Sequence, residues 1–597
     1  MIRSLGTIDL VVVAFLLLFL VVASMYSSFF RKKDSEEYFM ASRSLKWYSV
    51  AGSIFGTNIH AQQIIGMMGV GYSIGFAQSH YELLAVVAIL ILVYVFIPVY
   101  RKGNFFTLSQ FLENRFNKAS RLVYAILMLA FIMIQLIAGF YIGSRTLGIL
   151  FEGTAIAPDY LQGILVIAIA TIVFTVFGGM KSVVIADNIL TVIMVLAVLI
   201  IGTLTLSQPE IGGFAGLLKL DHAQANKMHL YLPSNHPDLP WTGIFTGLII
   251  LHFFYWTTNQ YQVHRVLAAE TERDAKLGSI VAGMLKFLIP FFSIGAGTAA
   301  FYLFNSRFGE NSVMPDDTFI RLLETVVPVG YGLSGLILAG LICAIFSAIY
   351  SMMNSVSTML AYDIYRNYIN KNASDRNTVR FGQMGIVAMC AVATILAYVT
   401  FDPNSSDNFF LILANQASYI KPGLVVVFFW GILWKKTHPI AALTVLIASP
   451  FIGLGLDIVY NHFLTNFDVV VSLFGAHFNF LHRVFMIFFV GSVLLVLLSH
   501  YFNRTRGIVP TNELSVSFSG TRNAVLKAAM IHVPILAMVI LNVITPQAAA
   551  YPAAALTFGL FMWYMKNEKS EYRFYQSDIF YAGILTAALV WILYFFA

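Results

Sequence analysis

The sequence predicts an all-α protein that crosses a membrane many times, and three observations support this fold class. Of its 597 residues, 59% are hydrophobic and only 11% are charged, which differs from the composition of soluble globular proteins. The mean hydropathy is +0.78, and uncharged apolar runs of bilayer-spanning length recur along the chain. Lysine and arginine gather in every second loop, which is the charge pattern of a polytopic helical protein.

The composition also excludes several functions. The basic residues behind the formal charge of +7 lie in short loops, so they do not indicate a nucleic-acid-binding surface. The two cysteines, Cys343 and Cys390, lie in apolar segments and indicate neither a disulfide framework nor a metal cluster. No phosphate-binding loop or nucleophile–base pair is recognisable, so neither ATP drive nor an enzyme is supported. The expected partners are a small solute and the lipid bilayer, with no obligate protein partner evident.

Segmenting the chain at turn and charge clusters predicts about 16 membrane spans. Their approximate limits are 8–30, 48–72, 78–100, 121–148, 156–178, 182–206, 241–264, 276–305, 328–362, 377–401, 407–434, 438–459, 478–500, 524–544, 548–565 and 575–596. The first is too long for a signal-peptide core and is expected to remain as a helix. If the N-terminus is outside, the basic loops face inward, and both termini lie on the extracytoplasmic side of the cell membrane.

Two connecting segments have a character of their own. The outward loop 207–240 is rich in Pro, Gly, Asn and His, and is expected to be a solvated connector, with a lid as the alternative. The inward segment FFTLSQFLENRF, between Lys102 and Arg121, has helical periodicity and is expected to form a helix at the membrane interface.

The stretch SIFGTNIHAQQIIGMMGVG, residues 53–71, interrupts an apolar span with polar side chains and glycines. Its polar members include Thr57, Asn58, His60, Gln62 and Gln63. Polar groups at membrane depth are tolerated only in a protein interior or a wet cavity. A helix broken here would free backbone groups to bind an ion or solute, as secondary transporters do. A helix-packing face with satisfied amides is the alternative.

Ionisable residues inside the predicted spans are costly and therefore informative. They are Glu82, Asp187, Lys286 and Lys421. A structural salt bridge is one interpretation for each, and it has equal support to a functional role at Asp187, which lies near an interface. For Glu82, Lys286 and Lys421 a water-lined cavity is favoured, because no apolar neighbourhood would hold them charged.

Two further polar clusters suggest binding sites. HFFYWTTNQYQVHR, residues 252–265, combines aromatic rings, hydroxyls and amides, which suits a ring-shaped polar solute. An aromatic belt is the alternative. Residues 340–365 are rich in small residues and carry the hydroxyls of Ser347, Ser351 and others. Hydroxyls together with main-chain carbonyls from a broken helix suit a hard monovalent cation, with pure helix packing as the alternative.

These stretches resemble the sodium:solute symporter family, and within it the bacterial sodium/galactose and animal sodium/glucose symporters. The resemblance covers roughly residues 35–445. It is carried by SEEYFMASRSLKWYSVAGSIFGTNIHAQQIIGMMGVGYSIG, Tyr81-Glu82, FTLSQFLENRFNKASR, FGGMKSVVIAD, YWTTNQYQVHRVLAAET, AIFSAIYSMMNSVSTMLAYDIYRNYI and GILWKKT. It implies a LeuT-type five-plus-five inverted repeat in which the first and sixth core helices are broken. The implied parts are an N-terminal helix and basic loop (1–47), repeats at 48–206 and 241–434 around the outward loop (207–240), and five peripheral helices (435–597).

The implied function is a secondary active symporter that couples inward Na⁺ movement to uptake of a sugar or polyol by alternating access. Alternatives are another solute (an anionic sugar such as sialic acid, inositol or an amino acid), H⁺ as the driving ion, and a non-concentrative sensor or leak. Na⁺ is the expected coupling ion, and no organic cofactor is expected. The family's sodium ligands map to the carbonyls of Gly56, Ile59 and Ala344 and the hydroxyl of Ser347. The candidate solute-binding residues are Asn58, Gln63, Tyr81, Glu82, Gln135, His252, Tyr255, Trp256, Lys286 and Lys421.

The sequence departs from the family at several of these positions. A usual sodium-site serine is Ala348, His252 replaces an asparagine, and His60 stands where serine is usual. Ala414 and Ala85 replace a glutamine and a serine of the pocket. Lys421 follows Ala414 by two helical turns and so shares its face. This lysine suits an anionic sugar, or else it pairs with Asp or Glu in the bundle.

Overall fold

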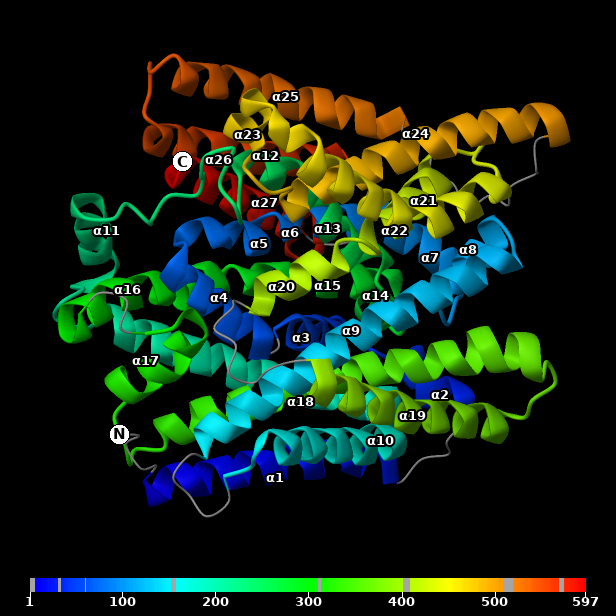
Figure 1. The fold of residues 1–597 in the computed structure, drawn as a ribbon, viewed down its shortest axis with the longest axis horizontal. Helices are drawn as coiled ribbons and strands as arrows, with labels where there is room; N and C mark the ends of the chain where they lie inside the picture. The colour runs from blue at the N-terminus through cyan, green and yellow to red at the C-terminus, as the bar shows by residue number, and fades with distance from the viewer. Residues whose placement is uncertain are drawn as a thin grey trace.

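The computed structural model describes residues 6–29, 34–59, 61–151, 157–309, 313–400, 409–507, 519–567 and 574–597. Within these ranges every regular element is helical, and two isolated β-bridges are the only strand-like pairings. Eleven described helices are long and apolar enough to cross a membrane. The predicted class, an all-α polytopic membrane protein, is therefore confirmed. In Figure 1 the helices run side by side, with α1 and α10 at one edge of the molecule and α24 and α25 at the opposite edge.

The first half of the chain contains a run of helices that ends before the long outward loop. These are α1 (Thr7–Phe29), α2 (Ser35–Met40), α3 (Trp47–Asn58), α4 (Ala61–Ser73), α5 (His80–Leu83), α6 (Ala85–Ile91), α7 (Ile97–Gly103), α8 (Leu108–Arg115), α9 (Lys118–Leu150) and α10 (Tyr160–Leu206). Helix α8 confirms the helix predicted in the inward segment. A capping box starts α10. The side chain of Asp159 accepts from the backbone N–H of Gln162 at 2.7 Å, and the side chain of Gln162 accepts from the backbone N–H of Asp159 at 3.1 Å.

Helix α10 covers two predicted spans, 156–178 and 182–206. Gly179 divides it with φ 66° and ψ −171°, a backbone conformation that a side chain would strain. Two helices therefore meet at this glycine, which lies between the two predicted spans.

The second half contains α11 (Gly213–Ala223), α12 (Trp241–Gly243), α13 (Ile249–Phe253), α14 (Gln260–Leu267), α15 (Glu272–Lys286), α16 (Gly295–Phe308), α17 (Thr318–Val326), α18 (Leu333–Met359), α19 (Asp375–Thr400), α20 (Phe409–Ala417) and α21 (Lys421–Leu433). The trailing helices are α22 (Pro439–His462), α23 (Asp468–Phe474), α24 (Phe480–Arg506), α25 (Ser519–Ile540), α26 (Pro546–Asn567) and α27 (Asp578–Phe595). Short 3₁₀- and π-helical segments adjoin these helices. They are η1 (Ala41–Arg43), η2 (Phe76–Ser79), η3 (Leu92–Phe96), η4 (Ile244–Leu248), η5 (Phe254–Thr258), η6 (Pro290–Ile294), η7 (Pro315–Asp317), η8 (Leu360–Ile369), η9 (Leu464–Asn466) and η10 (Phe574–Gln576).

The polar, glycine-rich stretch near the start of the chain is interrupted as a helix. Helix α3 ends at Asn58, and Ile59 leaves helical geometry with φ −93° and ψ 81° before α4 begins. Gly56 lets α3 lie very close to α10, because a Cβ there would stand 2.8 Å from the carbonyl oxygen of Asp187. The interruption thus lies against the second half of α10.

A second interruption separates η5 from α14. Asn259 is extended, with φ −86° and ψ 118°, and its side chain caps α14 by accepting from the N–H of Tyr261 at 3.3 Å. The adjacent carbonyl of Thr258 accepts from the hydroxyl of Tyr124 at 2.8 Å. A side chain from α9 thus satisfies a backbone group that the break leaves free.

The outward loop is packed rather than a plain solvated connector, so that expectation was wrong. It contains α11, whose Asp221 accepts from the N–H of Lys227 at 2.6 Å and from the hydroxyl of Tyr302 at 2.5 Å. Lys227 in turn donates to the carbonyls of Tyr72 and Ser73, at 3.0 and 2.6 Å, at the end of α4. The loop is therefore fastened to the end of an interrupted helix. Composition alone cannot show this, because Lys227 is held by backbone carbonyls, which every sequence has.

The trailing helices hold the turn between α20 and α21. The guanidinium of Arg483 donates to the carbonyl of Asn415 at 3.2 Å and to the hydroxyl of Ser418 at 2.7 Å. It also lies 4.0 Å from the ring centroid of Tyr419 and pairs with Asp457 of α22 at 3.1 Å. Helices α22 and α24 therefore support the turn between α20 and α21 through one arginine.

Replacing Arg483 by lysine is expected to lower the free energy of unfolding by about 2 kcal/mol, because an ammonium cannot reproduce the fork of bonds to the turn. Thermal melting of the purified protein measures this. The control is Arg506→Lys at the exposed end of the same helix, which should leave the melting temperature unchanged. Equal melting temperatures of the two variants would show that the contacts of Arg483 with this turn add no stability.

Candidate functional site

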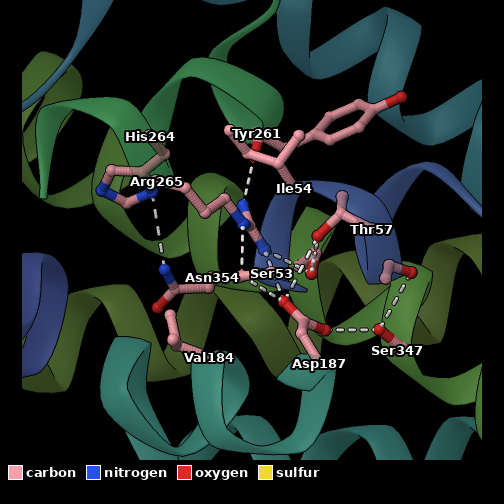
Figure 2. Close-up of polar contacts among 12 residues, drawn as sticks. Ser53, Ile54, Thr57, Val184, Asp187, Tyr261, His264, Arg265, Ser347 and Asn354 are labelled. Atoms are coloured by element: carbon pink, nitrogen blue, oxygen red, sulfur yellow. Dashed lines mark hydrogen bonds and ion pairs between the residues drawn. The ribbon is translucent and has the colours of Figure 1, made fainter. Parts of the chain in front are cut away.

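A buried polar cluster, which we call the carboxylate cluster, surrounds Asp187 of α10 (Figure 2). One carboxylate oxygen accepts from the hydroxyls of Ser53 at 2.6 Å and Thr57 at 3.3 Å. The other accepts from the hydroxyl of Ser347 on α18. The guanidinium of Arg265 on α14 stands 3.6 Å away, and both charged side chains have 0% exposure. A buried carboxylate is tolerable because it is both paired and hydrogen-bonded.

Arg265 ties this cluster to the second interrupted helix. It donates to the hydroxyl of Ser53 at 3.2 Å, to the hydroxyl of Ser351 and to the carbonyl of Tyr261. Figure 2 shows the guanidinium lying between Tyr261 and Asp187. One ion pair thereby links α3, α10, α14 and α18.

The structure brings two of the predicted sodium ligands together. The hydroxyl of Ser347 lies 3.4 Å from the carbonyl oxygen of Gly56. Ile59 follows at the break in the helix, and Ala344 is fully buried one turn before Ser347 on α18. Ala348 is buried beside Ser347 and supplies no side-chain oxygen. These positions offer oxygen ligands without net charge, which suit a hard monovalent cation.

Asp187 and Arg265 were not among the predicted site residues. The sequence marked Asp187 as a costly intramembrane carboxylate, which was the signal available for it. Its partner stands at the end of the aromatic 252–265 stretch. The pairing of two residues so far apart along the chain has no sequence signature.

A second buried cluster, which we call the lysine cluster, surrounds Lys286 of α15. Its Nζ lies 2.5 Å from a carboxylate oxygen of Glu82 and 2.5 Å from the side-chain oxygen of Asn58. The amide nitrogen of Gln63 donates to the other carboxylate oxygen of Glu82. Lys286 and Glu82 are 2% and 0% exposed, so they neutralise each other directly. The expectation of a water-lined cavity around these two residues was therefore wrong.

Aromatic rings form one wall of the lysine cluster. The ammonium of Lys286 lies 5.4 Å from the ring centroid of the buried Trp256, whose ring is 5.5 Å from that of Tyr255. The ring of Tyr81 is 6.4 Å from that of His252, and Nε2 of His252 has no hydrogen-bond partner among the described residues. Charged, amide and aromatic groups therefore face one another in one place.

Two predicted solute-binding residues stand apart from these bonds. Lys421 and Gln135 make no hydrogen bond or ion pair with residues that the structure describes. The bundle salt bridge considered for Lys421 is thus not formed in the described part of the chain. His60, singled out as unusual, lies outside the described residues.

The two clusters meet at consecutive residues of α3. Gly56 faces Ser347, the hydroxyl of Thr57 reaches Asp187, and the amide of Asn58 reaches Lys286. A shift of this short segment therefore changes both clusters together, which is the geometry that coupling two ligands requires.

Residues 38–448 of the chain match the sodium:solute symporter family. The chain belongs to this family. It is 30% identical over 473 residues to the sodium/glucose cotransporter of Vibrio parahaemolyticus, covering 75% of this chain and 85% of that one. It is 28% identical over 491 residues to the sodium/myo-inositol cotransporter 2 of Mus musculus, covering 77% and 71%. The predicted family resemblance is confirmed.

A solved structure has the same fold. It is a substrate-bound, outward-open Na⁺-coupled sialic acid symporter, with a TM-score of 0.70 and 19% identity over 85% of this chain and 100% of that chain. At this identity the likeness shows the fold alone. As a sodium:solute symporter, the chain is a multi-pass membrane transporter that couples Na⁺ to solute movement.

Proposed function

We propose that this symporter takes up a sugar or polyol-like solute, driven by inward movement of Na⁺ through alternating access. The observation that carries the proposal is the junction on α3, where consecutive residues reach a cluster rich in oxygen ligands and a cluster suited to a solute. The names of two relatives, a sodium/glucose and a sodium/myo-inositol cotransporter, support this solute class.

The proposed sodium site uses the carbonyls of Gly56, Ile59 and Ala344 and the hydroxyl of Ser347. That hydroxyl donates a hydrogen bond to Asp187, so the lone pairs of its oxygen remain available to a cation. The nearby carboxylate also makes the site more favourable for positive charge, which compensates for the oxygen missing at Ala348.

The proposed solute site uses the lysine cluster and its aromatic wall. Solute hydroxyls both donate and accept, so they can replace the bonds that Glu82, Gln63, Asn58 and Lys286 make to one another. The apolar face of a sugar ring would pack on Trp256 and its neighbour Tyr255, with Tyr81 and His252 nearby.

The proposed architecture has 16 spans and an inverted repeat of five helices over 48–206 and 241–434. The interruptions after Asn58 and Thr258 lie in the first span of each half, which supports the repeat. The end of α27 supports an extracytoplasmic C-terminus, because Leu230 of the predicted outward loop donates to the carbonyl of Phe596 at 3.0 Å. Gly6 approaches Gly330 in the loop before α18, which supports the same side for the N-terminus.

A cavity of about 780 Å³ opens on the proposed outward side. Its lining includes Ser73 at the end of α4, Lys227 and Asp238 of the outward loop, and Ile412 of α20. A polar opening bounded by an interrupted helix and a fastened loop suits solute entry from outside.

Replacing Ser347 by alanine is expected to abolish sodium-driven accumulation, because the site loses its only proposed side-chain ligand. Uptake into proteoliposomes with an inward Na⁺ gradient, compared with choline, measures this for a hexose, myo-inositol or sugar acid. Ser355→Ala, two turns further along the same buried helix, is the matched control and should retain uptake. Equal sodium-driven accumulation by both variants would remove Ser347 from the proposed ion site.

A further inference from the structure

Lys421, the first residue of α21, carries a positive charge for which the described protein supplies no negative partner. Its Nζ lies 5.3 Å from the ring centroid of Phe131 and 5.8 Å from that of Phe254. The side chain is partly buried and has no hydrogen bond or ion pair to any residue in the described ranges. Each aromatic face returns only about 0.5–2 kcal/mol, while desolvating an ion costs several kcal/mol.

The position of Lys421 does not serve stability. Helix α21 begins at this residue without a side-chain cap, and the positive end of a helix disfavours a cation. The other charges near the two clusters are paired, Arg265 with Asp187 and Lys286 with Glu82. Among the residues that the structure describes, Lys421 therefore leaves one positive charge without a counter-charge, and a bound Na⁺ would add another.

Lys421 and Lys286 both lie over aromatic rings of the same short helical segment, η5. Phe254, one of the two rings under the Lys421 ammonium, is followed directly by Tyr255 and Trp256, whose rings are 5.5 Å apart. The ammonium of Lys286 lies over Trp256 at 5.4 Å. Lys421 and the proposed solute site therefore both border η5.

Uncharged polar groups stand on the same side. His252 is within electrostatic range of both Lys286 and Lys421, and its Nε2 is unpartnered among the described residues. Gln135 lies one helical turn after Phe131 on α9, on the face that contacts Lys421. These groups can hydrogen-bond an anion that Lys421 neutralises.

We propose that Lys421 is a carboxylate-binding subsite of the solute chamber, and that the transported solute is a monosaccharide bearing one carboxylate. This deepens the proposed function and rests on it, since the ring and hydroxyls occupy the lysine cluster while the carboxylate pairs with Lys421. A carboxylate fits better than a phosphate monoester, because one ammonium neutralises one negative charge.

The test measures equilibrium binding to the purified full-length protein in Na⁺, using the matched pairs glucose and glucuronate, and galactose and galacturonate. The acid of at least one pair should bind about tenfold more tightly or better than its neutral partner. Lys421→Met should remove this preference with little change in affinity for the neutral sugar. Lys421→Arg should keep the preference, and Lys436→Met, at an exposed lysine, should not change it.

Charge reversal keeps the test decisive if Lys421→Met folds poorly. Lys421→Glu suits a helix N-terminus and should shift preference from glucuronate to the cationic sugar glucosamine. Equal binding of acids and neutral sugars, or a preference unchanged by Lys421→Met and Lys421→Glu, would overturn the proposal. If the Lys421 proposal fails in this way but the protein still takes up a neutral sugar with Na⁺, the proposed function stands. Loss of sodium dependence for every solute would refute the proposed function itself.

Discussion

Replacing Asp187 by alanine is expected to abolish sodium-dependent uptake and to destabilise the protein by about 3–5 kcal/mol. The guanidinium of Arg265, which is fully buried, would remain without its counter-charge. Ser347 would also lose the acceptor that orients its hydroxyl beside the carbonyl of Gly56. Both the frame of the proposed ion site and its negative charge would be lost together.

Thermal melting with and without Na⁺, together with uptake, measures this result. Asp187→Asn keeps the shape and one acceptor, so it separates loss of charge from loss of packing. The double variant Asp187→Asn with Arg265→Met should recover part of the stability lost in either single variant, but not the sodium dependence. A protein that keeps full sodium-driven uptake without this carboxylate would remove Asp187 from the ion site.

Removing one partner of the Glu82–Lys286 pair is expected to abolish solute binding and to destabilise the protein by about 3–5 kcal/mol. Each side chain is almost completely buried, so the remaining charge would have neither water nor a partner. Lys286 also fixes the amide of Asn58, and Glu82 fixes that of Gln63. The solute-facing arrangement would therefore be lost along with the charge balance.

A double-mutant cycle tests this prediction. Glu82→Gln with Lys286→Met should melt closer to the wild type than either single variant, while its solute binding stays absent. The exposed pair of Lys46 and Glu270, with N···O 2.7 Å, offers the control, because Glu270→Gln should change neither property. Additive destabilisation by the two single changes would contradict a direct, isolated ion pair.

The sequence was sufficient for the helical membrane fold because hydropathy and loop charge are local properties. The break after Asn58 was also predictable, since glycines and amides weaken a membrane helix wherever they occur. The partner of each buried charge could not be predicted from the sequence. Glu82 and Lys286 each lie in an apolar span that would not hold a lone charge, which led to the expectation of a wet cavity. Only the packing of α15 against the first half of the chain brings them together.

The same reason explains the remaining differences. The sequence marked Asp187 as a costly intramembrane carboxylate. Nothing in the sequence, however, shows whether Arg265 pairs with a carboxylate inside the membrane or lies at the membrane interface. The outward loop is fastened mainly through backbone carbonyls, which carry no residue signature. For Lys421 the sequence left two interpretations, and the structure removes one within its described residues, since no carboxylate meets this lysine there.

The central claim is that Na⁺ bound near Ser347 and Gly56 drives solute accumulation through the shared α3 segment. The most direct measurement is solute uptake into proteoliposomes containing the wild-type protein, with an inward Na⁺ gradient, an inward H⁺ gradient in choline, or neither. The account predicts accumulation above equilibrium with the Na⁺ gradient alone. Accumulation that is equal in choline, or that follows the H⁺ gradient without Na⁺, would contradict it.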